Sequence, residues 1–287
     1  MANKTPSALV TGCSEGGIGI GLVHELRRQG IHVFATARSV DKMASLQDLS
    51  GITLLTMDVT NPASIRAAVA VVTAATDGAL DYLVNNAGRQ ALRPFLDMSI
   101  DNDMRAMFDV NVFGVAAVTQ AFAPLLIQSS KRGKGGMVVN LASVAAYVCP
   151  PYMGGYAASK AACEVMSETM RHELKPLGVK VLTVLTGAVK TKIFANAPTP
   201  PALPEDSLYL AASDEFQTRA SGQEVHGRLG TVEAFARGLV GEMVRGREGR
   251  VKVGNMSAMI PFMAYHAPAS LFDYFVEMNT GLDKVGK

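Results

Sequence analysis

The chain has few of the features that mark secreted proteins. Only three of its 287 residues are cysteine, namely Cys13, Cys149 and Cys163, and no C-x-x-C spacing occurs. An odd number of scattered cysteines indicates reduced thiols, and no signal peptide opens the sequence. We therefore expect an intracellular, cytoplasmic protein, with a peripheral contact to a membrane or lipid surface left open.

Signs of metal, nucleic-acid and membrane-spanning proteins are also missing. The five histidines show no metal-ligand spacing, so we expect no metal site. The formal net charge is +2 and no basic block occurs, which argues against nucleic acid as a partner. No apolar run reaches the roughly 20 residues that a spanning helix needs. No internal repeat is visible.

What is present is a strand followed by a glycine-rich turn and a helix. Residues 8–11 read as a short buried strand and lead into Gly12-Cys13-Ser14-Glu15-Gly16-Gly17-Ile18-Gly19, after which apolar residues recur at helical spacing until Gly30. Glycines let a backbone approach a pyrophosphate, and the free N–H groups of a helix N-terminus meet its negative charge. This order favours a dinucleotide site; the alternative is a mere tight turn.

The residues after the second predicted strand, 31–36, bear on the choice of cofactor. A free ribose 2′-hydroxyl is matched by an acidic residue at the end of this strand, and a 2′-phosphate by an arginine. The sequence there is Ala37-Arg38-Ser39, and the nearest acid, Asp41, falls in the next helical turn, which Ser39 or Asp41 would cap. Arg38 is therefore predicted to bind a phosphate; the alternative is a solvated surface charge.

The strand–helix alternation continues along the chain. Predicted strands at 53–57 and 80–84 flank a helix over about 62–75, which Thr60-Asn61-Pro62 caps. Asp58 would accept a hydrogen bond from an adenine amino group, and the turn Asn85-Asn86-Ala87-Gly88 would hold loops and cofactor together. Both segments can also be read as ordinary Asx turns.

Tyr156 and Lys160 stand four residues apart in a predicted helix over 156–174, so their side chains share one face. An ammonium group beside a phenol stabilises the phenolate and suits it to general acid/base work. Ser143 follows the predicted buried strand 137–141, and its hydroxyl can face the same cleft. Alone, a Tyr-x-x-x-Lys pair is more often a chance feature of a solvated helix.

Jointly, these motifs resemble the short-chain dehydrogenase/reductase family over nearly the whole chain, and more closely its fungal-type branch of acyl-dihydroxyacetone-phosphate reductases and related steroid and secondary-metabolite reductases. The resemblance implies an α/β fold over 1–287: a single Rossmann-type domain with a doubly wound parallel sheet of about seven strands and helices on both faces. Further predicted strands lie at 179–185 and 249–253, and further helices at 101–128 and 231–245.

The family's chemistry is hydride transfer. By resemblance, Tyr156 exchanges the proton, Ser143 hydrogen-bonds the substrate oxygen, Lys160 favours the phenolate and holds the nicotinamide ribose, and Asn111 interrupts its helix to keep a proton-relay water. Asn111 alone would more often be a local kink or a surface amide. The resemblance implies these NADPH/NADP+ contacts: Gly12, Ser14, Gly17, Ile18, Gly19, Arg38, Asp58, Val59, Asn85, Ala87, Gly88, Tyr156, Lys160, Val189 and Thr191.

Two departures from the family pattern limit the assignment of the family's residue roles to this chain. The glycine-rich loop has one residue more than usual, which leaves open whether Gly16 or Gly17 is the central glycine. After the sixth strand, Thr186-Gly187 replaces the usual Pro-Gly, although the segment of Val189 and Thr191 that follows still matches.

Two segments stand outside the alternation. Residues 192–225 are expected to form a substrate lid, with a short helix starting at 207–210; the alternative is a plain surface excursion. The C-terminal extension, 255–287, is rich in Met, Phe and Tyr. It is expected to be core or subunit interface first, a wall of an apolar pocket second, and a membrane contact last.

The function expected is that of an NADPH-dependent ketoreductase, which reduces a ketone of a lipophilic lipid, steroid-like or secondary-metabolite substrate to an alcohol. The alternatives are a non-catalytic NADPH-binding regulatory or scaffold protein of the same fold and an interaction module in a biosynthetic assembly. Apolar residues along 104–126 and 156–174, together with the resemblance, predict a homodimer or homotetramer packed through these helices.

Overall fold

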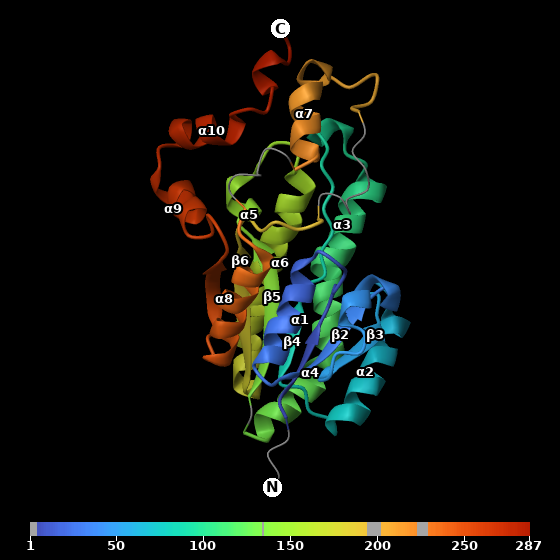
Figure 1. Cartoon of the computed structure of the whole chain (residues 1–287). Helices are drawn as coiled ribbons and strands as arrows, with labels where there is room; N and C mark the ends of the chain where they lie inside the picture. The colour runs from blue at the N-terminus through green and yellow to red at the C-terminus, as the bar shows by residue number, and fades with distance from the viewer. Residues whose placement is uncertain (1–4, 134, 194–201, 223–228) are drawn as a thin grey trace.

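The computed structural model describes residues 5–133, 135–193, 202–222 and 229–287. Seven parallel strands form one sheet in the order β3-β2-β1-β4-β5-β6-β7, with helices on both faces (Figure 1). The doubly wound architecture is as expected. The strands are β1 Ser7–Val10, β2 His32–Ala37, β3 Ile52–Thr56, β4 Tyr82–Asn85, β5 Gly136–Ser143, β6 Val179–Thr186 and β7 Gly249–Val253.

The predicted strands are confirmed, with differences at their ends that matter for the site. β5 runs to Ser143, two residues beyond the predicted end, and Ser143 pairs with Thr186 of β6. β4 begins at Tyr82, two residues later than predicted, because the N–H of Leu80 bonds to the carbonyl of Leu125 outside the sheet. The sheet thus delivers Ser143 and Thr186 side by side at its carboxyl edge.

Two hydrophobic layers hold the helices on the sheet. Leu22 and Leu26 of α1 (Ile18–Arg28) and Leu239 of α8 (Val232–Val244) pack in one buried cluster on one face. The cluster on the other face contains residues of α2 (Pro62–Thr76) and α4 (Gly114–Lys131), and side chains of α6 (Gly154–Leu174) pack against it. Burial of these apolar side chains is the main stabilising term of such a layered fold.

Local signals explain where α2 starts. The side chain of Asn61 accepts hydrogen bonds from the backbone N–H groups of Ala63 and Ser64, at 2.9 and 3.2 Å, and Pro62 occupies the first turn. Asn61 therefore satisfies two donors that the helix itself leaves unpaired.

The helical stretch around Asn111 is wider than an ordinary α-helix. A π-helical turn over Asp109–Phe113 separates α3 (Ala106–Phe108) from α4, and a second one over Ile100–Arg105 precedes α3. Asn111 lies in the widened turn and is fully buried. The predicted interruption of the helix at Asn111 is confirmed.

The same stretch corrects the expectation about apolar runs. Among the described residues, Ile100–Lys131 is the one helical stretch long and apolar enough to cross a membrane by length and composition. Half of its most apolar window is buried inside the fold, as in the core helix of a globular protein. Val118 and Phe122 of α4 are fully buried within the chain, so much of the apolar surface expected at a subunit interface belongs to the core instead.

The short helix predicted to start at 207–210 is confirmed, at the last of these residues. Helical structure begins at Leu210, with a 3-10 turn over Leu210–Ala212 and α7 over Ser213–Ala220. Before it, the hydroxyl of Ser207 donates to Asp97 at 2.6 Å and accepts from the N–H of Tyr209. The other parts of the expected lid, 194–201 and 223–225, lie outside the described residues.

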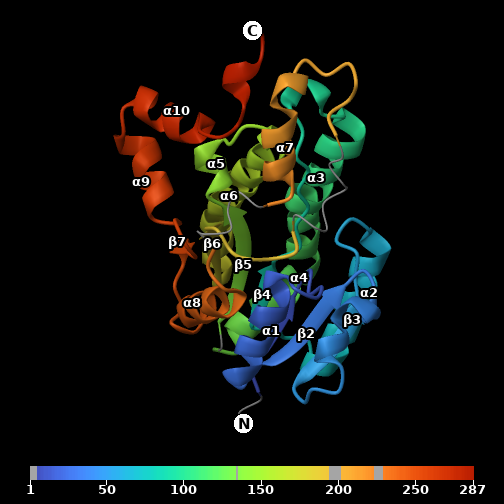
Figure 2. The same cartoon turned by 45° about the horizontal axis from the view of Figure 1, so that its top comes forward.

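The C-terminal extension leaves the body of the protein. Helix α9 (Met259–His266) packs beside α5 (Ala145–Val148), and α10 (Ala269–Glu277) follows α9 toward the end of the molecule that carries α7 (Figure 2). Pro261 is the one buried residue of α9, and α10 has none. Phe262, Tyr265 and Tyr274 are more than half exposed in the single chain, so this apolar stretch is not core, and its expected role as a subunit interface stays a prediction.

The remaining short helices connect these elements. They are single turns or slightly longer 3-10 segments: Val40–Leu46, Phe95–Asp97, Lys175–Leu177 and Leu282–Lys284.

Candidate active site

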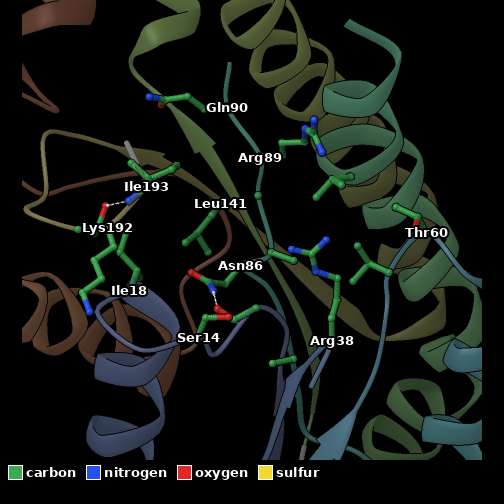
Figure 3. Close-up of a pocket in the computed structure, with 18 of the residues that line it drawn as sticks. Ser14, Ile18, Arg38, Thr60, Asn86, Arg89, Gln90, Leu141, Lys192 and Ile193 are labelled. Atoms are coloured by element: carbon green, nitrogen blue, oxygen red, sulfur yellow. Dashed lines mark hydrogen bonds between the residues drawn. The ribbon is translucent and has the colours of Figure 1, made fainter. Parts of the chain in front are cut away.

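A cavity of about 710 Å³ opens at the carboxyl ends of the strands (Figure 3). Its walls come from the segments after β1, β2, β3 and β4 on one side and from β5, β6 and α6 on the other. The strand order reverses between β1 and β4, and in open α/β sheets ligands bind at that switch point. The topology therefore predicts a ligand site here.

The glycine-rich loop forms the floor of the cavity. Gly12 has φ +73°, and a side chain there would put its Cβ 2.7 Å from the Cα of Ala87. Gly17 lines the cavity and precedes the first turn of α1, whereas Gly16, with φ +74°, makes the tight turn and packs against Lys192. Gly17 is thus the ligand-facing glycine and Gly16 the turn glycine. Gly19 lets α1 approach the loop, since a Cβ there would lie 2.7 Å from the carbonyl oxygen of Gly12.

The turn after β4 is tied to this loop by Asn86, a residue missing from the predicted contacts. Its side-chain nitrogen donates to the carbonyl oxygens of Thr11 and Gly12 at 2.7 and 3.1 Å. The hydroxyl of Thr11 accepts from the backbone N–H groups of Asn86 and Ala87. Asn86, Ala87 and Gly88 all line the cavity.

Asn85, predicted as a cofactor contact, lies elsewhere. Its side chain donates to Thr119 at 3.0 Å and to Asn140 at 2.8 Å, inside the helical layer. Side chains alternate along a strand, so Asn85 faces the same way as Leu83, which is buried on that face. Asn85 therefore holds β4, β5 and α4 together and does not line the cavity.

Arg38 and Asp58 occupy the end of the cavity beyond β2 and β3. The exposed Arg38 side chain points into the cavity (Figure 3), and no hydrogen bond or ion pair holds it among the described residues. Asp58 and Val59 also line this end. One oxygen of Asp58 accepts from the N–H and the hydroxyl of Thr60 at 2.9 and 2.8 Å. This oxygen therefore forms the Asx turn that the sequence offered as the alternative to adenine binding.

These residues fit a dinucleotide that carries a 2′-phosphate. β2 ends at Ala37 and Arg38 follows it directly, so the end of this strand carries no acidic residue. Glu15 and Asp58 also line the cavity, but hydrogen bonds engage both carboxylates: Glu15 accepts from the backbone N–H of Ser45 at 2.8 Å, and Asp58 accepts from Thr60. Hydrogen bonds with Ser45 hold the pKa of Glu15 below its ordinary value, so this group stays a carboxylate. Ser39 and Asp41 bond to each other at 3.1 Å, and Ser39 makes no side-chain cap.

At the other end, α6 presents Tyr156 and Lys160 to the cavity, and both are at least nine-tenths buried. The ammonium of Lys160 donates to the carbonyl oxygen of Leu141 at 2.7 Å and lies 5.9 Å from the centre of the Tyr156 ring. A buried cation and a buried phenol thus share one wall, as their spacing on the helix predicts.

Asn111 and Ser143 lie directly behind this wall. The Nδ2 of Asn111 donates to the backbone oxygen of Arg89 and to the hydroxyl of Ser159, and its Oδ1 accepts from the N–H of Arg89. The Ser143 hydroxyl accepts from the N–H of Ala145 at 3.1 Å. Neither residue is part of the cavity lining itself, although both adjoin it.

The structure separates Val189 and Thr191, the two cofactor contacts predicted after β6. Thr191 lines the cavity, and its hydroxyl accepts from the N–H of Ile193 at 3.3 Å. Val189 does not line it, because its side chain packs against the buried cluster that contains Phe235 and Val253. Lys192 and Ile193, the first residues of the expected lid, close this side (Figure 3).

Three cavity residues that the sequence does not reveal carry buried polar atoms without a hydrogen-bond partner in the described part of the chain: Arg89 Nε, Gln90 Nε2 and Thr186 Oγ1. Thr186 stands where the sequence departs from Pro-Gly, which is a signal that could have marked it. Arg89 and Gln90 follow Gly88 directly, but no spacing rule marks them. In the described residues no group of three His, Cys, Asp or Glu side chains could hold a metal ion.

Comparisons with known proteins agree with this geometry. The sequence model of the short chain dehydrogenase family matches residues 6–201. The chain is 41% identical over 276 residues to the short-chain dehydrogenase ptmH of Penicillium ochrochloron, covering 96% of this chain and 98% of that protein. It is 38% identical over 243 residues to the NADPH-dependent 1-acyldihydroxyacetone phosphate reductase of Schizosaccharomyces pombe, covering 83% and 79%.

Comparison with a solved structure shows that the fold is shared as well. The short chain dehydrogenase of Burkholderia cenocepacia in complex with NADP is 26% identical, with a TM-score of 0.71 over 95% of this chain and 98% of that one. The family match, the relatives and the shared fold lead to one conclusion: the chain belongs to the short-chain dehydrogenase/reductase family of oxidoreductases.

Proposed function

We propose that the protein is an NADPH-dependent reductase that converts a ketone of a lipophilic substrate to an alcohol. The observation that carries this proposal is one continuous cavity with Arg38 at one end and the buried pair Tyr156 and Lys160 at the other. A relative bound to NADP and a relative named NADPH-dependent support the same cofactor, NADPH/NADP+.

Different residues of the cavity would bind different parts of the cofactor. Arg38 would pair with the 2′-phosphate, and the N–H groups around Gly17 and Ile18 would meet the pyrophosphate. Lys160 has one N–H bonded to Leu141 and two left for the ribose next to the nicotinamide. When bound, the cofactor supplies the hydride.

The chain itself supplies the proton. Tyr156 donates from its hydroxyl to the oxygen that becomes the alcohol, and the neighbouring ammonium of Lys160 stabilises the phenolate that remains. Ser143, at the end of β5 and next to the lining residue Ala142, would hydrogen-bond the same oxygen. Asn111 holds the Arg89 backbone beside them and would retain a relay water near Lys160.

An apolar substrate is supported by the surroundings of Tyr156. Ala91, Met98 and Met107 are buried in one cluster with the tyrosine. A second buried cluster contains Leu203 and Phe216, which belong to the segment that we propose as a lid, 192–225. None of these five residues lines the cavity itself, but they make the buried surroundings of Tyr156 and of the segment after Gln90 rich in carbon, which would favour a lipophilic ligand that extends beyond the tyrosine.

The test is a panel of lipophilic ketones mixed with NADPH, followed by absorbance at the nicotinamide band and identification of the product. Consumption of NADPH with formation of one alcohol supports the proposal. Tight NADPH binding with no turnover on any ketone would favour the non-catalytic binding protein, and binding of neither cofactor nor ketone would favour an interaction module. We also propose a cytoplasmic homo-oligomer, as is usual in this family.

A further inference from the structure

Gln90 is a buried polar residue that the proposed reaction leaves without a role. Its side chain lines the cavity, the residue is 3% exposed, and its Nε2 has no hydrogen-bond partner in the described part of the chain. Buried amide groups are almost always hydrogen-bonded, so an orphaned one beside a ligand cavity calls for an explanation.

The backbone next to Gln90 is held rigidly. Asn111 accepts from the N–H of Arg89 at 2.9 Å and donates to the oxygen of Arg89 at 2.8 Å, so one side chain satisfies both backbone groups of that residue. On the other side, Ala91 and Leu92 are almost completely buried. The position of Gln90 is therefore preset before any ligand arrives.

Gln90 lies at the substrate end of the cavity. Its neighbour Ala91 shares a buried cluster with Tyr156, and Leu92 shares one with Phe216 of α7. In the view of Figure 3, Gln90 and Ile193 are drawn on one side of the cavity and Ser14 and Arg38 on the other. The segment that carries Gln90 thus runs from the cavity lining into the buried clusters of Tyr156 and Phe216.

We propose that Gln90 is a specificity-determining residue whose Nε2 donates a hydrogen bond to a second oxygen of the substrate, apart from the ketone that is reduced. The inference rests on the proposed function. The favoured substrates are lipophilic ketones that carry a further carbonyl, ester or hydroxyl oxygen. Arg89 Nε, also buried and unpartnered at the cavity, is another N–H donor on the same segment and fits a ligand that supplies acceptors.

The experiment compares matched ketones on wild type and Gln90→Met. Each pair has one carbon skeleton with and without a second oxygen, and the position of that oxygen is varied along the series. Wild type should prefer at least one oxygenated member. Gln90→Met, which keeps length but removes the donor, should lower kcat/KM for that member about 10-fold, since a net hydrogen bond is of this order. It should change the deoxygenated partner by less than about 3-fold.

Gln90→Glu and Gln120→Met serve as comparisons. Gln90→Glu keeps the shape but presents a carboxylate that repels an acceptor, so the preference should also be lost. Gln120 is exposed on α4 and is absent from the cavity lining, so its variant should behave as wild type. The melting temperature and the dissociation constant for NADPH report whether the variants are folded.

A second readout separates this inference from the proposed function. Dissociation constants of the paired ketones are measured with NADP+, which cannot reduce them. Weaker binding of the oxygenated member alone to Gln90→Met supports the inference even in the absence of turnover. Equal effects on both members, or no effect on either, would overturn it while leaving ketone reduction intact. Wild type that reduces no ketone would instead overturn the proposed function.

Discussion

The ammonium of Lys160 donates to the backbone carbonyl of Leu141 at 2.7 Å, which links α6 to the carboxyl end of β5. This bond fixes the cation beside Tyr156, 5.9 Å from the ring centre. A flexible lysine side chain is thereby held in one position before any ligand binds, so less conformational entropy is lost on binding.

Lys160→Ala should therefore damage two properties together. The proposed bond to the ribose is lost, and so is the stabilisation of the Tyr156 phenolate, so we expect weaker NADPH binding and a lower kcat. Fluorescence titration and steady-state kinetics measure the two effects. Lys131→Ala, at the far end of α4, is the matched control. A variant with normal affinity and normal kcat would remove Lys160 from the site.

Tyr156→Phe should separate chemistry from binding. It removes one oxygen from a ring that is 8% exposed, so packing is preserved. We expect kcat to fall by roughly 10²-fold or more, the usual contribution of a positioned proton donor, with NADPH affinity nearly unchanged. Tyr82→Phe, outside the cavity lining, is the control. More than a tenth of wild-type activity on every ketone would contradict the assigned role.

Arg38→Ala should change the choice of cofactor. A guanidinium pairs with a 2′-phosphate through charge-assisted hydrogen bonds, so wild type should favour NADPH over NADH by about 10- to 150-fold. The variant should lose affinity for NADPH and keep that for NADH, and Ala37→Asp should shift the preference further toward NADH. Dissociation constants for both cofactors decide the matter, with Arg66→Ala on α2 as control. If Arg38→Ala weakened the binding of NADPH and NADH equally, Arg38 would not determine the choice of cofactor.

Much of this fold could be predicted because the signals are local. The alternation of strands and helices, the glycine-rich turn and the Tyr156–Lys160 spacing each depend on residues close together in the chain. Gly16 and Gly17 were indistinguishable by sequence, because both satisfy the motif. The structure distinguishes them, because Lys192 packs against Gly16 whereas Gly17 lines the cavity.

Features that depend on distant neighbours could not be predicted. Asn85 and Asn86 are adjacent amides, and which one faces the cavity depends on the sheet register and on Thr119 and Asn140. The unpartnered state of Gln90 is likewise a property of what surrounds it. The apolar tail is the clearest case, since composition alone is compatible with core, interface or pocket wall.

Assembly should follow from surfaces that the single chain leaves exposed. Phe113 at the start of α4 and Val165 on α6 are each more than 60% exposed, although both lie on the helices predicted to pair. We expect a solution mass of two or four times 30.3 kDa by light scattering. A strictly monomeric mass at micromolar concentration would contradict this.

Two surface variants locate the interface. Phe113→Glu with Val165→Glu should lower the mass if the subunits pair through α4 and α6, because each charge would have to be buried. Phe262→Ser with Tyr274→Ser should lower it if α9 and α10 pair instead. If neither double variant changes an oligomeric mass, the contact lies on another face.

The cysteines should differ sharply in reactivity. Cys13 and Cys163 are fully buried and Cys149 is exposed. Burial raises the pKa of the Cys13 thiol to about 12 and also raises the pKa of Cys163. The thiolate is the reactive form, so at pH 8 the native protein should be alkylated by iodoacetamide at Cys149 alone, and at all three cysteines after unfolding in denaturant.

Mass spectrometry of both samples counts the adducts, and Cys149→Ser should remove the native reaction. Rapid native alkylation of Cys13 would mean that the glycine-rich loop opens readily, because its thiol lies under that loop and bonds to the carbonyl of Val10.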